Sequence, residues 1–152
     1  MDALEQLREQ IRQAFPATRY YGTVTTCDCD ECSEIREGLN RKQWDEVPQE
    51  FLASTGNPTL LTPEAFVAFL PAYLLRALDD LSPHGAVSGL TVYSLTPSRE
   101  EWQVRRVFER IRLMTGAQVQ AVRAFLKFAQ ENSGDPEWNR RDFARAFEKI
   151  WL

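Results

Sequence analysis

The sequence lacks the residue patterns by which many enzyme active sites are recognised. It contains one histidine, His84, and no serine or cysteine stands at a spacing that would pair with it in a nucleophilic site. It has neither a Walker loop nor a Gly-x-Gly-x-x-Gly turn for binding phosphate groups. No catalytic residue can be named, and we therefore expect a protein that is not an enzyme.

Signals for secretion and membrane insertion are also lacking. The first residues, MDALEQLREQ, provide neither a basic n-region nor an apolar h-region. The apolar runs fall short of the roughly 20 residues that a bilayer requires. We therefore expect a cytoplasmic protein with no membrane partner, whose three cysteines are reduced thiols.

What the sequence does contain is enough apolar material for one folded domain. Of its 152 residues, 43% are hydrophobic and 11% aromatic, which excludes the disordered class. A chain of this length buries about 68–70% of its unfolded surface. We predict a single all-α domain over residues 1–152, in which a multi-helix bundle surrounds one central helix.

The central helix is predicted at about residues 61–81, the most apolar segment. Thr62 stands where a helix cap is needed, and Pro63 suits the first helical position. The segment is apolar on most of its circumference, so other helices should cover it on most sides. Pro71 lies inside it and removes one backbone hydrogen bond, which predicts a kink.

Periodicity and capping residues predict the other helices. Residues 86–95 fit a helix or a strand, and a helix is favoured because no second strand is available to pair with. The helices expected are Asp2–Phe15, Asp30 to about Asn40, a short turn from Trp44 to Leu52, 86–95, one opened by a Ser98 and Glu101 capping box, one opened by a Thr115 and Gln118 box and closed by Ser133 and Gly134, and a final one from Asn139.

Basic residues of the last third are the only basis for a nucleic-acid interface. We expect them on helix faces opposite the apolar stripes, which include Val107 and Phe108 in the first of these helices, and they are interleaved with acidic residues in an acidic chain. A nucleic-acid partner is therefore not expected. The residues concerned are Arg105, Arg106, Arg110, Arg112, Arg140, Arg141, Arg145 and Lys149.

Several of these segments together resemble a known family. The pattern is a Cys-x-x-Cys pair at Cys29 and Cys32, then Trp44, then LTPEAFVAFLPAYL from residue 61, then a Thr-x-x-Gln helix start followed by AVRAFL. It resembles a family of small bacterial proteins of unknown function, over most of the chain. The resemblance implies a predominantly helical single domain, and it supplies no activity, substrate or catalytic residue. Cys27 lies outside the shared pattern.

The run Cys-Asp-Cys-Asp-Glu-Cys from Cys27 to Cys32 is the most suggestive local cluster. Thiolates two or three residues apart can reach one zinc ion, but a tetrahedral site needs four ligands. The candidates for a fourth are His84, Asp28, Asp30 and Glu31. A redox role for Cys29 and Cys32 is the other alternative, which the flanking carboxylates oppose by raising thiol pKa. We expect no tightly bound cofactor, and keep zinc binding or redox response as the alternative function.

Acidic residues are concentrated in residues 27–50, which carry eight carboxylates and three cations within a chain of net charge −4. Such a surface favours a basic protein partner. The leading interpretation is therefore a protein-binding module, of the immunity or antitoxin type, whose contact residues are Glu34, Glu37, Trp44, Asp45 and Glu46.

If this segment contacts a basic protein, replacing Glu34, Glu37 and Glu46 by Lys should slow association by about tenfold or more, because the charges attract the partner over a long range. Association rates at two salt concentrations would measure this. An on-rate that does not change would show that the acidic segment is only a solvated surface.

Overall fold

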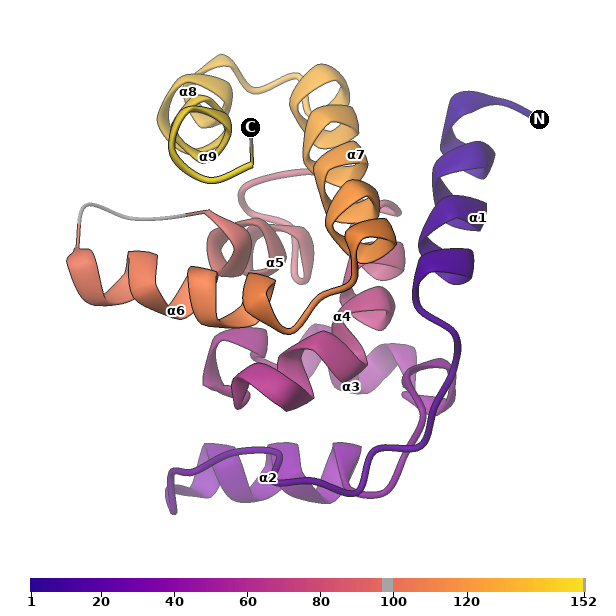
Figure 1. Ribbon diagram of the computed structural model, residues 1–152, viewed down its shortest axis with the longest axis vertical. Helices are drawn as coiled ribbons and strands as arrows, with labels where there is room; N and C mark the ends of the chain where they lie inside the picture. The colour runs from indigo at the N-terminus through magenta and orange to yellow at the C-terminus, as the bar shows by residue number, and fades with distance from the viewer. Residues whose placement is uncertain (97–99, 152) are drawn as a thin grey trace.

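The structure, a computed structural model of the chain, describes residues 1–96 and 100–151 (Figure 1). Every regular element within these ranges is helical, so the predicted all-α fold class is confirmed. The elements are α1 (Ala3–Ala14), α2 (Asp30–Leu39), the 3₁₀ turn η1 (Trp44–Glu46), α3 (Gln49–Ser54), the 3₁₀ turn η2 (Pro58–Leu60), α4 (Pro63–Ala77), α5 (Ser88–Leu95), α6 (Glu101–Arg112), α7 (Gly116–Asn132), α8 (Pro136–Trp138), the π turn η3 (Asn139–Phe143) and α9 (Ala144–Lys149).

Helix α4 is the centre of the molecule, as predicted. It contacts α1, α3, α5 and α6 and both 3₁₀ turns, and nine of its fifteen residues are buried. Its start is set by Thr62, whose hydroxyl accepts a hydrogen bond from the backbone N–H of Ala65 at 3.2 Å. The helix is shorter than the predicted 61–81, because Leu61 precedes the cap and the chain after Ala77 continues in tight turns.

Pro71 does not end this helix. The residue is buried, and α4 runs unbroken from Pro63 to Ala77 through it. Because proline has no backbone N–H, the carbonyl of Val67 loses its usual helical partner. The predicted kink stays a prediction.

The N-terminal half packs along α4, from Thr62 at its start to Asp79 just past its end. Helix α1 packs against α7 and α4, and Asp2 caps it by accepting a hydrogen bond from Glu5 N–H at 2.8 Å, as predicted. The irregular segment 16–27 then passes to α2 at the opposite edge of the molecule (Figure 1). Thr62 fixes this segment by donating from its hydroxyl to Thr23 O at 2.7 Å and from its N–H to Val24 O at 2.9 Å.

The C-terminal half follows the predicted helices with one shifted start. Residues 86–95 contain helix α5, and both hydrogen bonds of the Thr115 and Gln118 capping box are present. The last helical stretch begins at Pro136 and not at Asn139, because Asp135 caps it by accepting from Trp138 N–H at 2.9 Å. It passes through the π turn η3 into α9, which ends at Lys149. Trp151 follows, and its indole N–H donates to Leu95 O at 2.7 Å.

Helix α6 shows a face different from the predicted one. Phe108, expected inside, is 44% exposed, whereas Arg110, expected on the outer surface, is only 5% exposed. The buried positions of this helix are Val107 and Arg110. The helix begins at Glu101, and the predicted cap residue Ser98 lies outside the described residues.

Adjacent leucines in α4 allow a test of its central position. Leu74 is fully buried, whereas Leu75 is half-buried. Leu74→Ala should lower the free energy of unfolding by about 3 kcal/mol, because it removes buried methyl groups and leaves a cavity. Leu75→Ala, with the same chemistry one position away, should cost clearly less. Urea denaturation of both variants measures the difference, and equal losses would contradict the central placement of α4.

Candidate functional site

Three cysteine side chains converge at the start of α2. The sulfur atoms of Cys27, Cys29 and Cys32 all lie within 4.8 Å of one another, and all three are free thiols. Cys27 and Cys29 are exposed, whereas Cys32 is buried against the core. The sequence predicted Cys27, Cys29 and Cys32 as the thiols of a possible metal site, and the structure brings these three together.

Backbone hydrogen bonds hold the sulfurs in this arrangement. Cys29 is the N-cap residue of α2, and its sulfur accepts from Cys32 N–H at 3.4 Å. The sulfur of Cys27 accepts from Cys29 N–H at 3.3 Å. Arg36, one and a half turns into α2, donates to Thr25 Oγ1 at 2.8 Å and to the carbonyl of Cys27 at 2.6 Å. The guanidinium thus fixes the loop that carries the first thiol.

The thiols differ in acidity because their surroundings differ. Hydrogen bonds with the Cys27 side chain and the Cys32 backbone lower the pKa of Cys29, although the nearby charge of Glu31 opposes this. Burial raises the pKa of Cys32 to about 11, and the neighbouring sulfurs add to the effect. Cys29 is therefore the accessible nucleophile of the cluster, and Cys32 stays protonated at neutral pH.

The structure does not bring the other proposed ligands to the thiols. His84 is exposed in the connection between α4 and α5, beyond the end of α4 opposite to Thr62. Within the described residues, no carboxylate joins the three sulfurs either, so Asp28, Asp30 and Glu31 stand outside the cluster. Among the residues that the structure describes, the donor set is three thiols without a fourth protein ligand.

The acidic segment 27–50 is divided between free and engaged carboxylates. Glu34 and Glu37 on α2, and Asp45 in η1, are exposed. Glu46 accepts from Gln43 N–H at 2.8 Å, which holds the pKa of its carboxyl below the usual range, and it also pairs with Arg19 at 3.0 Å. Reversing Glu46 would therefore also break a local cap.

Trp44 is half-buried and already has a structural contact. Its indole N–H donates to the carbonyl of Phe15 at 2.8 Å, across 29 residues of sequence, and its ring packs against the core. The residue ties η1 to the end of α1. The assignment of this acidic segment to a basic partner, and of an immunity or antitoxin role to the protein, stays a prediction.

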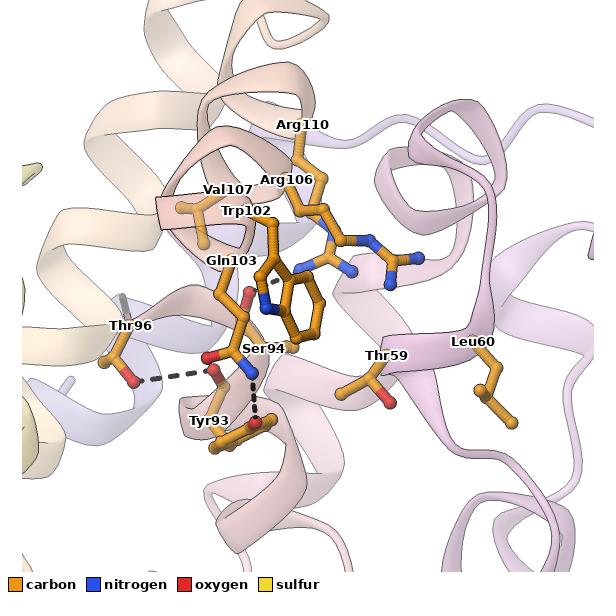
Figure 2. Close-up of a pocket in the computed structure, with 10 residues that line it drawn as sticks. All are labelled: Thr59, Leu60, Tyr93, Ser94, Thr96, Trp102, Gln103, Arg106, Val107 and Arg110. Atoms are coloured by element: carbon orange, nitrogen blue, oxygen red, sulfur yellow. Dashed lines mark hydrogen bonds between the residues drawn. The ribbon is translucent and has the colours of Figure 1, made fainter. Parts of the chain in front are cut away.

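A second candidate site, absent from the sequence prediction, is a groove of about 250 Å³ between η2, α5 and α6 (Figure 2). The rings of Tyr93 and Trp102 lie on it, and the guanidinium groups of Arg106 and Arg110 point into it from consecutive turns of α6. Gln103 of α6 links the two helices by donating a hydrogen bond from its side-chain amide to the Tyr93 hydroxyl of α5 at 2.9 Å. We call this site the α5–α6 groove.

Comparison with known proteins places the chain in a family without adding a function. The model of the family of unknown function DUF6714 matches residues 3–152, so the chain belongs to that family. No curated protein and no solved structure matches the chain. In the part of the chain that the structure describes, no helix is long and apolar enough to cross a membrane.

The thiols should react with iodoacetamide in a fixed order. Cys29 should react first, and at a lower pH than an ordinary thiol, because its pKa is lowered. Cys27 should follow, and Cys32 should react only after unfolding. Fragmentation mass spectrometry of the tryptic peptide 20–36 locates each label, and denatured protein is the control in which the order should disappear. Labelling of Cys32 as fast as Cys29 in folded protein would contradict the assignment.

Proposed function

We propose that the protein binds a thiophilic metal ion, with Zn²⁺ the first candidate, in an exchangeable manner through Cys27, Cys29 and Cys32. The observation that carries the proposal is that three sulfur atoms lie within 4.8 Å of one another. Cys27, Cys29 and Cys32 are close in sequence, and the buried Cys32 anchors the group to the core. Thiolates are the ligands that soft ions such as Zn²⁺ and Cu⁺ prefer.

The donor set fits such an ion with a small adjustment. In a tetrahedral site with Zn–S bonds of about 2.3 Å, neighbouring sulfurs lie about 3.8 Å apart, so the cluster has to contract by about 1 Å at most. The N–H groups of Cys29 and Cys32 already donate to sulfur, which favours the thiolate form that a metal requires.

Three ligands suit reversible binding better than a structural role. Structural zinc sites are closed by four protein ligands, whereas sites with three protein ligands keep a position for water or for an incoming group. A metal held here would stay exposed through Cys27 and Cys29. This agrees with the expectation of no tightly bound metal, since an exchangeable ion is lost on purification.

A reversible disulfide between Cys29 and Cys32 is the second candidate. It is supported by the contrast between an exposed thiol of lowered pKa at a helix start and a buried thiol of raised pKa. Closing the bond removes two electrons and two protons, which a disulfide such as oxidised glutathione would accept as it is cleaved to two thiols. Alkylation after incubation with oxidised glutathione distinguishes the two candidates, because only the redox function protects the pair without metal.

Titration with Cd²⁺, followed by its thiolate charge-transfer absorbance, should saturate at about one ion per chain. Cys27→Ser should weaken binding by at least about tenfold through loss of one ligand. This variant is informative because Cys27 is exposed, so the fold should be kept. The apparent affinity should rise from about pH 6 to pH 8, because the proton on Cys32, whose pKa is about 11, must be displaced.

His84→Ala is the matched control, since it removes the only histidine without touching the cluster. It should bind Cd²⁺ as tightly as the unaltered protein. A titration without saturation, or one that Cys27→Ser leaves unchanged, would contradict metal binding at these thiols.

A further inference from the structure

We propose that the α5–α6 groove binds an acidic segment of a protein partner, with a carboxylate seated between Arg106 and Arg110 and an apolar residue against Trp102. This inference is independent of the metal site, because the groove and the thiols lie on different elements.

The first observation is a buried cation without a counter-ion. Arg110 is 95% buried, yet among the described residues no carboxylate pairs with it, and its one hydrogen bond runs to Ser94 O at 2.7 Å. Its guanidinium also lies over the ring of Phe66, 4.2 Å from the centroid. A guanidinium has five N–H donors, so most of its hydrogen-bonding capacity is unused. None of its free nitrogens is fully buried, so these donors are open to the groove, where an incoming carboxylate would supply the missing counter-ion.

Arg106 makes the same site more strongly positive. It stands one turn before Arg110, its guanidinium points into the same groove (Figure 2), and no ion pair with it is found in the described ranges. Burial lowers the pKa of Arg110 to about 10, the charge of Arg106 lowers it further, and the charge of Glu109 opposes both effects. Two planar guanidinium groups around one opening match the fork geometry of a carboxylate.

Exposed apolar side chains on the helices that form the groove indicate a protein and not a small anion as the source of that carboxylate. Seven large hydrophobic side chains are exposed in the described residues, and five of them lie on α5, α6 or the cap of α6. Two of them, Tyr93 and Trp102, line the groove beside Arg106, and exposed Trp, Tyr and Arg side chains are enriched at protein interfaces. The five are Leu90, Tyr93, Trp102, Phe108 and Leu113.

The size of the groove limits what enters it. A volume of about 250 Å³ accommodates one or two side chains and not a drug-sized molecule. We therefore place one Asp or Glu and a neighbouring Leu or Phe of the partner in the groove, while flanking residues of the partner cover the exposed part of α6.

A library of random heptapeptides displayed on phage provides the probe. Selection on the whole protein should enrich Asp or Glu next to Leu, Phe or Trp. A synthetic peptide of the enriched sequence should then bind at least about tenfold more weakly to Arg106→Gln and to Trp102→Ala, and its Asn or Gln analogue should lose affinity to the same extent. Affinity should also fall as salt is added.

Arg105→Gln is the matched control, because Arg105 is exposed on the same helix but does not line the groove. It should change peptide affinity by less than about twofold. Arg106 is exposed as well, so neither variant should disturb folding, and circular dichroism would test this.

Three results would overturn the proposal. One is enrichment of peptides without acidic residues, or of none. Another is equal loss of affinity in the Arg105→Gln and Arg106→Gln variants. The third is displacement of the peptide by acetate or inorganic phosphate at the peptide's own concentration, which would assign the groove to a free small anion.

Discussion

The rest of the structure depends on the burial of one apolar helix. Helix α4 carries no charge through its middle, and its buried residues are spread over more than one face. Such a helix is stable in water only if other elements cover it on most sides, since each large side chain gains about 1.5–3 kcal/mol on burial. Four helices and two 3₁₀ turns provide that cover. Segment 16–27, which ends at Cys27, and the α5–α6 groove both depend for their positions on this packing.

The sequence predicted those features of the fold that depend only on residues close together in the chain, such as helix caps. The caps at Asp2, Thr62 and Thr115 depend on residues three apart, and all three hydrogen bonds are present. The predicted start of the last helical stretch, at Asn139, was wrong. Asn139 and Asp135 are both good caps, and the Pro that follows Asp135 favours the earlier one. The prediction of which face of α6 is buried was wrong for a different reason. Both Phe108 and Arg110 neighbour Val107, and only tertiary packing decides which turns inward.

The candidate sites were predictable only in part. The spacing of Cys29 and Cys32 predicts that they are close, because Cys29 is the N-cap of α2 and Cys32 stands in its first turn. The position of Cys27 depends on how Arg36 holds the preceding loop, which no sequence spacing specifies. The α5–α6 groove could not be predicted at all, since η2 and α6 are brought together across 40 residues by their common packing on α4. The only signal of the groove in the sequence was Arg110, a basic residue three positions after Val107, where helical spacing places a buried residue.

Thr62 restrains segment 16–27, which ends at Cys27, more firmly than the irregular backbone of this segment would suggest. One residue caps the central helix and, through its hydroxyl and its N–H, holds two successive carbonyls of segment 16–27. That segment cannot detach without exposing the Thr62 amide and loosening the first turn of α4. We therefore expect amide protons on both sides of Thr62 to exchange more slowly than those of a loop held only by its own turns.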